Sequence, residues 1–323
     1  MEFAKTSAEL KQKKDSVFKI LKKQSTLQCF VLVGMVFLFL FSYIPMVGLI
    51  IAFKKYNISD GIMGFFTSPW AGFKFFKEFF TEVDCGIIIR NTISISLLKV
   101  IFTFPLPILF AIMISEVRAI KLKKFIQTAS YLPHFISWVV VYGIIFAFFS
   151  NNGVVNNILS ALHLVKEPIP YLTNENNFWP LVVISDAWKE FGWWAIIFIA
   201  NIVSIDPSLY EAADIDGATR IQRILYVTLP CIKGAISVVL ILTMGNLLGG
   251  GMSGSNFEQC LLLGNDLNRL TSEIIQTHVL KVGLVQVRFS YATAVGLLQS
   301  VISVILIFSS NLVVKKISGK GLY

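Results

Sequence analysis

The feature that most constrains this chain is a set of long apolar segments with almost no charge. The stretch Cys29 to Phe53 contains no Asp, Glu, Lys or Arg. A helix needs about 20 apolar residues to cross roughly 30 Å of hydrocarbon, so this segment alone can span a membrane. The whole sequence agrees, because 55% of its 323 residues are hydrophobic and only 15% are charged, against about 25% in soluble domains. Mean hydropathy is +0.72. We therefore expect an all-α integral membrane protein.

Six transmembrane spans are predicted. The first is too long for a cleaved signal peptide, whose apolar region holds about 7 to 15 residues. The fourth is unusual because it carries Asp186, Lys189 and Glu190 near its middle, and the second contains a single lysine, Lys99. The predicted spans are Cys29 to Phe53, Ile93 to Ser115, Ile126 to Phe149, Phe178 to Ile205, Ile232 to Gly249 and Tyr291 to Val314.

Basic residues in the connecting segments predict the orientation. Lys and Arg concentrate in residues 1–28, in residues 116–125 and after residue 314, and short basic segments of membrane proteins stay in the cytoplasm. Both termini and the connection 206–230 are therefore expected to be cytoplasmic. The predicted division is a basic cytoplasmic segment 1–28, a six-span domain 29–314 and a cytoplasmic tail 315–323. The outer connections are then 54–91, 150–177 and about 250–290, the last with a flexible glycine-rich start.

Several function classes are excluded. The net charge is +9, and most of the Lys and Arg residues that produce it lie directly beside apolar segments. This position is typical of a membrane protein and argues against nucleic-acid binding. The four cysteines show no CxxC spacing, and His134, His163 and His278 lie far apart, so neither a metal site nor a general base is expected. No G-x-x-x-x-G-K-[ST] loop occurs, so the chain does not bind ATP through that motif. We expect a transport subunit without a catalytic site or a cofactor of its own.

The connection between the fourth and fifth spans predicts two short helices. Asp206 is a good N-cap, Pro207 suits the first helical position, and Tyr210 to Ala213 continue the helix. Gly217 supplies a left-handed stop. A second helix follows with apolar residues at helical spacing until Pro230 ends it. Such a turn presents a compact surface to a soluble partner, or it merely joins two spans.

At this point the chain resembles a known family. Glu211-Ala212-Ala213, with Gly217 four residues later and Leu229-Pro230 after it, resembles the EAA signature of permease subunits from binding-protein-dependent ABC importers. Four further stretches are similar to the sugar-importer branch, in particular to alginate and polysaccharide permeases. These are Tyr43 to Phe53, Trp188 to Trp193, Phe257 to Gln259 and Tyr291 to Ser300.

The resemblance implies a set of partners. In this family the EAA loop forms coupling helices that dock into separate ATP-binding subunits, which hold ATP and Mg. It further implies a second homologous permease, most simply in a heterodimer, an extracytoplasmic solute-binding protein that delivers an oligosaccharide, and a location in the bacterial cytoplasmic membrane. The coupling residues it implies are Tyr210, Glu211, Ala212, Ala213, Asp216, Gly217, Arg220, Leu229 and Pro230.

The charged residues of the fourth span form one helical stripe. Asp186, Lys189, Glu190 and Trp193 are spaced i, i+3, i+4 and i+7. Charges inside a membrane helix face a cavity or a partner, and an aromatic ring beside polar groups suits a sugar. The alternative is a structural stripe with an Asp186–Lys189 pair within the helix, or a helix end that lies nearer the membrane surface than predicted.

The similarity to maltose permeases adds candidates on the fifth span. There the sugar-contacting residues lie about one helix before and one helix after the EAA loop. Counting from Glu211 reaches the same stripe and Thr243, Asn246 and Leu247, which with it form the predicted substrate pathway.

The alternative function is an ion-coupled secondary transporter or channel that uses Asp186 and Glu190. It predicts inverted repeats and broken helices, which the sequence does not display, and it leaves the EAA-like loop without a role. The sequence does not identify the sugar: Lys189 is suited to a uronate carboxylate, but Asp186 and Glu190 can neutralise it instead.

Overall fold

The chain is helical throughout the part that is described. The computed structural model describes residues 24–318, and within this range it holds no β-strand, only one isolated antiparallel bridge between Lys54 and Trp70. The prediction of an all-α fold is confirmed. The α-helices are α2 (Ser25–Leu38), α3 (Ile44–Met46), α4 (Gly64–Thr67), α5 (Lys74–Thr81), α6 (Cys85–Thr103), α7 (Pro105–Ser115), α8 (Ile120–Tyr131), α9 (Trp138–Phe149), α10 (Val154–Ala161), α11 (Glu175–Val203), α12 (Pro207–Ile215), α13 (Arg220–Arg223), α14 (Leu229–Gly245), α15 (Asn256–Leu263), α16 (Arg269–Ser272), α17 (Ile275–Leu280) and α18 (Phe289–Ser318).

Five helical runs are long and apolar enough to cross a membrane, and a sixth results if α11 and α12, bent by 70° from each other, count as one span. The six predicted spans agree with this number. Most of the basic segment 1–28 and the end of the tail 315–323 lie outside the described residues. The five runs are Ser25–Phe53, Cys85–Ser115, Trp138–Ala161, Arg220–Gly245 and Phe289–Lys316.

The third predicted span, Ile126 to Phe149, is wrong as a continuous helix. Pro133 has no N–H to donate, and its ring disfavours the α-helical path of the preceding turn. The chain passes through a 3₁₀ segment at Leu132–Phe135, and Ile136 is extended. Ser137 then caps a new helix by accepting a hydrogen bond from the Val140 N–H. The third helical run that is long and apolar enough to cross a membrane is therefore Trp138–Ala161, further along the chain than predicted.

The prediction that Pro230 ends the second helix of the connection is also wrong. Ile224–Thr228 form a π-helical turn in which the Leu229 N–H bonds to the Ile224 carbonyl, five residues back. Because the wider turn makes room for the proline ring, Pro230 occupies the first turn of α14 and the helical run continues from Arg220 to Gly245.

The fifth span ends earlier than predicted, and the glycine-rich segment after it is not a free loop. Helix α14 stops at Gly245 rather than at Gly249. Gly249, Gly250 and Gly251 are buried, and Gly250 and Gly251 have φ values of 112° and 64°. A residue with a Cβ is strained at such angles. The glycines thus let the chain fold back into the protein.

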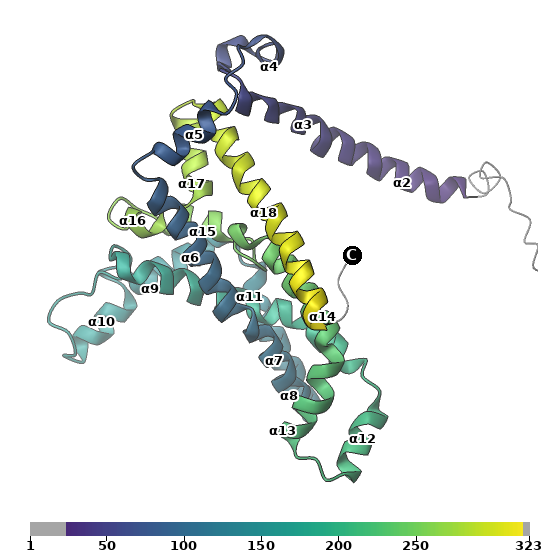
Figure 1. Ribbon diagram of the computed structural model, residues 1–323. Helices are drawn as coiled ribbons and strands as arrows, with labels where there is room; N and C mark the ends of the chain where they lie inside the picture. Colours follow the sequence, from purple (N-terminus) through teal and green to yellow (C-terminus); the bar gives the residue numbers. More distant parts are fainter. Residues whose placement is uncertain (1–23, 319–323) are drawn as a thin grey trace, which may run out of the picture.

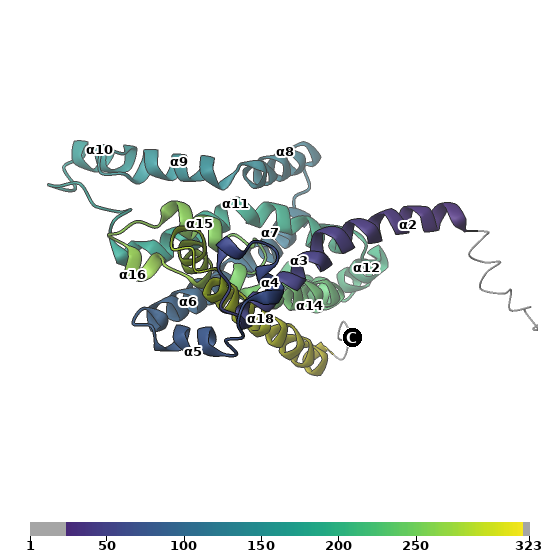
Figure 2. The same cartoon turned by 90° about the horizontal axis from the view of Figure 1, so that it is seen from above.

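The helices pack in a layered body with three apolar clusters along its length. Helix α11 lies in the middle and contacts α6, α7 and α14, while α14 packs on α18 (Figure 1). Helices α8, α9 and α10 follow one another along a flank, and α2 extends away from the body (Figure 2). The clusters centre on Phe79 and Tyr291, on Phe178 and Ile274, and on Phe198 and Ile232. Helices α12 and α13 protrude at one end.

Candidate functional site: an exposed helical turn and a buried polar network

The segment from Asp206 to Arg223 forms a protruding helix-turn-helix. The Asp206 carboxylate accepts a hydrogen bond of 2.9 Å from the Ser208 backbone N–H and so caps α12. This bond also lowers the pKa of Asp206. Thr219 and Gln222 form a reciprocal capping box at the start of α13. The predicted N-cap, the proline at the first helical position and the first helix agree with the structure.

The turn itself depends on Gly217. Its φ is 73°, and a Cβ added there meets nothing within 4 Å, so only the backbone conformation requires glycine. Two side-chain contacts hold the arms together: Arg223 pairs with Asp214 at 2.6 Å, and the Tyr210 hydroxyl lies 3.0 Å from that of Thr228. Asp214, Arg223 and Thr228 were not among the candidates from the sequence.

The turn offers its surface to the surroundings. No residue of α12 is buried, and Ile215 is 86% exposed. Among the predicted coupling residues, the exposed ones are Glu211, Ala212, Asp216, Gly217, Arg220 and Pro230, whereas Tyr210, Ala213 and Leu229 are half-buried.

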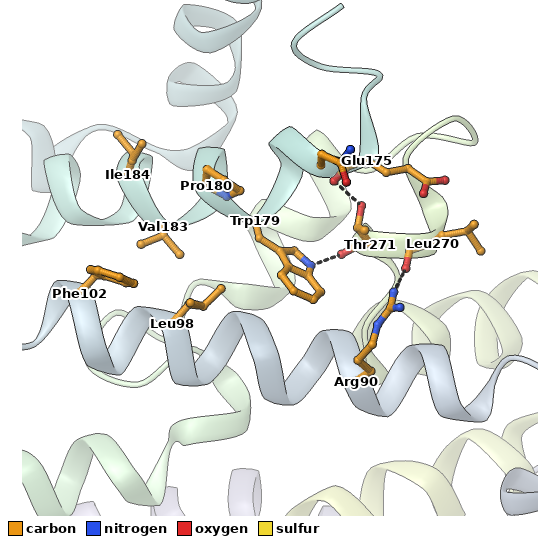
Figure 3. A pocket seen from close by; sticks show the side chains of 11 residues that line it. Arg90, Leu98, Phe102, Glu175, Trp179, Pro180, Val183, Ile184, Leu270 and Thr271 are labelled. Carbon is orange, nitrogen blue, oxygen red and sulfur yellow. Dashed lines mark hydrogen bonds between the residues drawn. The ribbon is translucent and has the colours of Figure 1, made fainter.

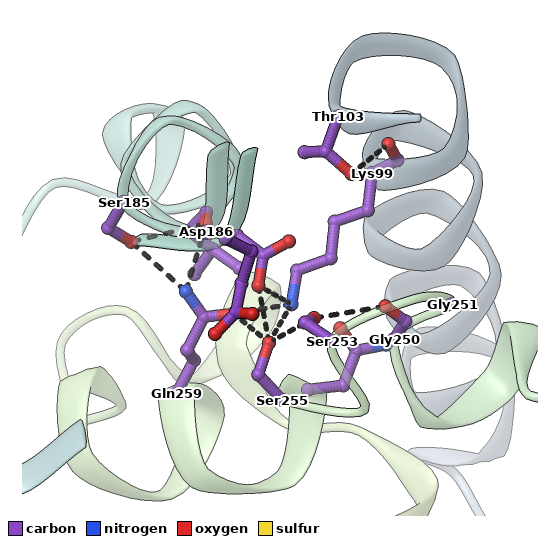
Figure 4. A network of polar contacts seen from close by, with 12 residues as sticks. Lys99, Thr103, Ser185, Asp186, Gly250, Gly251, Ser253, Ser255 and Gln259 are labelled. Carbon is purple, nitrogen blue, oxygen red and sulfur yellow. Dashed lines mark hydrogen bonds and ion pairs between the residues drawn. The ribbon is translucent and has the colours of Figure 1, made fainter. Parts of the chain in front are cut away.

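A buried ion pair joins α6 to α11. The Lys99 ammonium lies 3.4 Å from the Asp186 carboxylate, and both side chains are at most 2% exposed. The Ser255 hydroxyl donates to Asp186 at 2.5 Å and accepts from Lys99 at 2.7 Å. Gln259 accepts from Lys99 through its carbonyl oxygen and donates to Ser185 at 3.0 Å (Figure 4). A buried charge is stable only with such partners.

Lys189 and Glu190 belong to a second cluster, beside the break between α8 and α9. The Lys189 ammonium donates to the His134 carbonyl at 2.8 Å and to Glu190 at 3.0 Å. The other Glu190 oxygen lies 2.8 Å from His134 Nδ1. Trp193 stacks on the His134 ring, with centroids 4.3 Å apart. The single predicted stripe is therefore divided between two clusters, and the alternative Asp186–Lys189 pair is wrong, because each residue pairs elsewhere.

The predicted residues of the fifth span meet the glycine-rich segment. Thr243 is buried and donates to the Val239 carbonyl at 2.7 Å, whereas Asn246 is exposed and donates to the Gly251 carbonyl at 3.0 Å. Leu247 is half-buried in the following 3₁₀ turn. The same segment continues to the buried network.

Ser253 and Ser255 connect the glycine-rich segment to the buried network. Ser253 donates to the Gly250 carbonyl at 3.2 Å and lies 2.8 Å from Ser255, which bonds Asp186. The glycine-rich segment and Ser255 thus connect Asn246 to Asp186, and the two side chains do not contact each other directly.

Sequence reasoning missed His134, Ser255 and Gln259, which lie far from α11 in the chain. Lys99 had a signal, since it is the single charge in an otherwise apolar span and such a charge requires a partner. His134 had none beyond its residue type.

A cavity of about 710 Å³ lies between α6 and α11. Its polar end contains Arg90, Trp179 and Thr271, and its apolar end contains Phe102 and Ile184 (Figure 3). None of these residues was a candidate from the sequence.

The chain is similar to known transport proteins over nearly its whole length. Residues 103–319 match the family described as "Binding-protein-dependent transport system inner membrane component". Protein LplB of Bacillus subtilis is 40% identical over 304 residues, which cover 94% of this chain and 92% of the relative. The polygalacturonan/rhamnogalacturonan transport system permease protein YteP of the same organism is 40% identical over 314 residues, which cover 97% and 95%.

Two solved structures of bacterial ABC transporters contain a chain of similar fold. The crystal structure of a bacterial ABC transporter involved in the import of the acidic polysaccharide alginate contains a chain with a TM-score of 0.84 and 36% identity, covering 94% of this chain and 99% of that one. A second structure, of a bacterial alginate ABC transporter in complex with an alginate pentasaccharide-bound periplasmic protein, gives the same TM-score and identity over 95% and 100%.

Proposed function

Because this chain belongs to the family of binding-protein-dependent transport system inner membrane components and is a sugar ABC importer permease, we propose that it is one of two permease subunits that import an oligosaccharide across the bacterial cytoplasmic membrane. The observation that carries this proposal is the match of nearly the whole chain to permeases of polysaccharide import. A second, different permease completes the pathway in a heterodimer.

The substrate arrives from an extracytoplasmic solute-binding protein. A relative of similar fold is known in complex with such a protein and its bound pentasaccharide. The connections 54–91, 150–177 and 250–290 contact it here. Both termini lie in the cytoplasm, with the basic segment 1–28 before the six-span domain 29–314 and the tail 315–323 after it.

Two separate ATP-binding subunits, which hold ATP and Mg, drive the transport. They dock on the α12–α13 turn, whose exposed residues include Glu211, Asp216 and Arg220. A rigid, capped turn with exposed apolar residues such as Ile215 suits such a contact. Movement of the ATPases is transmitted through the turn into α11 and the Arg220–Gly245 run.

The sugar passes along the face of α11 that carries Asp186, Lys189, Glu190 and Trp193, and past Thr243, Asn246 and Leu247. Trp193, at 36% exposure, and Asn246 are the accessible members, and they offer an aromatic ring and an amide to the sugar. The ion-coupled alternative is not supported, because Asp186 is paired with Lys99, and Glu190 with Lys189.

Reconstitution of the complete importer tests this function. The two permeases, the ATPases and the binding protein are placed in liposomes, and uptake of labelled oligosaccharides is measured together with ATP hydrolysis. We expect uptake only with ATP and the binding protein. Uptake driven by an ion gradient without the ATPases, or no uptake of any sugar, would contradict the proposal.

Gly217 gives a specific test of the docking role. Gly217→Val should lower sugar-stimulated ATP hydrolysis severalfold at unchanged membrane insertion, whereas Gly217→Asn should retain most of it, because Asn tolerates the left-handed conformation. Full stimulation in the valine variant would count against docking at this turn.

A further inference from the structure

Arg90 is held in place at the polar end of the cavity between α6 and α11. Its guanidinium donates to the Leu270 carbonyl at 2.6 Å and to the Asn91 amide oxygen at 3.1 Å. It also lies over the indole of Trp179, 5.7 Å from the ring centroid. Trp179 is fixed in turn by a hydrogen bond of 2.9 Å from its Nε1 to the Thr271 carbonyl. Figure 3 shows that these side chains meet where α6, α11 and α16 come together.

The positive charge of Arg90 has no counter-ion among the residues that the structure describes. Its hydrogen-bond acceptors are neutral oxygens. Two other arginines at this end of the protein are paired: Arg269 with Asp84 and Glu273, and Arg288 with Glu78. At Arg269 and Arg288 the protein itself supplies the carboxylate, whereas it supplies none to Arg90 within the described residues.

One carboxylate lines the same cavity without neutralising Arg90. Glu175 stands in the first turn of α11, but it forms no ion pair with Arg90 within the described part of the chain. Figure 3 shows its carboxylate directed away from the guanidinium. The cavity therefore offers an anion one fixed cation with an aromatic ring beside it.

The cavity adjoins the proposed sugar pathway. Trp179 and Val183 line it, and with Asp186, Glu190 and Trp193 they follow the spacing i, i+4, i+7, i+11 and i+14, which is a single face of a helix. Toward its apolar end the cavity reaches residues next to the Lys99–Asp186 pair. The cavity therefore lies at the outer end of the α11 face along which the sugar is proposed to pass.

We propose that Arg90 and Trp179 form a subsite for a uronic acid residue of the transported oligosaccharide. This inference rests on the proposed function. The guanidinium binds the uronate carboxylate through a charge-assisted hydrogen bond, and the indole contacts the apolar C–H groups of the sugar ring. A cavity of about 710 Å³ falls in the range of small-ligand sites, roughly 300 to 1,000 Å³.

The test compares an acidic sugar with a neutral one of the same shape. A galacturonic acid trisaccharide and its methyl ester are titrated into the complete importer in nanodiscs by calorimetry. We expect Arg90→Gln to weaken binding of the acid about tenfold and to leave the ester unchanged. Arg90→Lys keeps the charge and should recover most of the affinity for the acid.

Two further variants separate the subsite from general effects. Arg118→Gln removes an exposed arginine outside the cavity and should change neither affinity. Trp179→Phe keeps an aromatic ring and should weaken both sugars by a similar, smaller factor. Yields of the assembled complex are measured for all variants, so that a folding defect is distinguished from lost binding.

Equal binding of the acid by wild type and Arg90→Gln, or equal weakening of acid and ester at normal assembly, would overturn the inference. An importer that binds and takes up the ester but not the acid would overturn it as well, while leaving the oligosaccharide function intact. Failure of the wild-type importer to take up any oligosaccharide refutes the proposed function instead.

Discussion

The α12–α13 turn and the Lys99–Asp186 network are held together by opposite means. The turn is exposed and is fixed by local contacts, through the caps at Asp206 and Thr219, the left-handed Gly217 and two side-chain pairs that join its arms. The network is buried and is fixed by side chains from α6, α11, α15 and the segment before it. A change in the turn therefore stays local, whereas a change in the network reaches α6, α11, α15 and the segment before α15.

This difference fits two mechanical roles. A turn with few tertiary contacts can keep its shape while it is pushed as a unit. A buried network stabilises one arrangement of its helices, because separating the charges leaves each of them unpaired. Variants in each region show whether the distinction holds.

The largest effect is expected from breaking the buried pair. Lys99→Met or Asp186→Asn alone leaves an unpaired or half-satisfied polar group and should lower the free energy of unfolding by about 3 to 5 kcal/mol. The free energy of unfolding and the yield of assembled complex are the measurements. Lys121→Met, at an exposed position, serves as the control.

The double variant Lys99→Met/Asp186→Leu should recover much of that loss, since an apolar pair of similar volume often replaces a buried ion pair at little cost. If the double variant is as unstable as the sum of the single ones, the network is held by contacts other than the ion pair.

Much of the turn could be predicted from the sequence, and little of the network. Asp206, Pro207 and Gly217 act on their near neighbours, so residue type and spacing suffice. Asp186 is bonded by Ser255, 69 residues away, and no periodicity within one helix indicates such a partner. The prediction at Pro230 was wrong because the five residues before Leu229 form a π-helical turn, which accommodates the proline ring within a continuous helical run.

The next largest effect is expected when alanine replaces Gly192, and Gly217 provides the comparison. A Cβ at Gly192 would lie 2.1 Å from the Ser130 backbone carbonyl, so Gly192→Ala must separate α8 from α11 and should cost about 1 to 3 kcal/mol. Gly217→Ala meets no atom within 4 Å and should cost only the left-handed strain, about 1 kcal/mol.

The free energy of unfolding of both alanine variants, measured in the assembled complex, checks whether the Gly192 variant is the less stable one. The Gly192 variant should also loosen the Lys189–His134 contact, which joins α11 to the 3₁₀ segment directly after α8. Equal destabilisation by both would mean that α8 adapts to the extra methyl group.

A smaller effect is expected from Tyr210→Phe. It removes the hydroxyl that lies 3.0 Å from Thr228 and keeps the ring, so about 0.5 to 1.5 kcal/mol should be lost. Thr228→Val removes the other partner, and the two changes together should cost less than their sum if the hydroxyls bond each other. Strict additivity in this double-mutant cycle would show that they do not.

The smallest effect is expected from Arg223→Gln. The Arg223–Asp214 pair joins the two arms of the turn, but Asp214 is 57% exposed, and exposed pairs contribute about 0 to 1 kcal/mol. The loss should disappear at high salt, which screens the wild-type pair. Sugar-stimulated ATP hydrolysis should stay near the wild-type rate, because the caps and Gly217 still set the angle between α12 and α13. A severalfold drop in that rate at unchanged stability would instead assign the angle to the ion pair, and the turn would then depend on side chains as the buried network does.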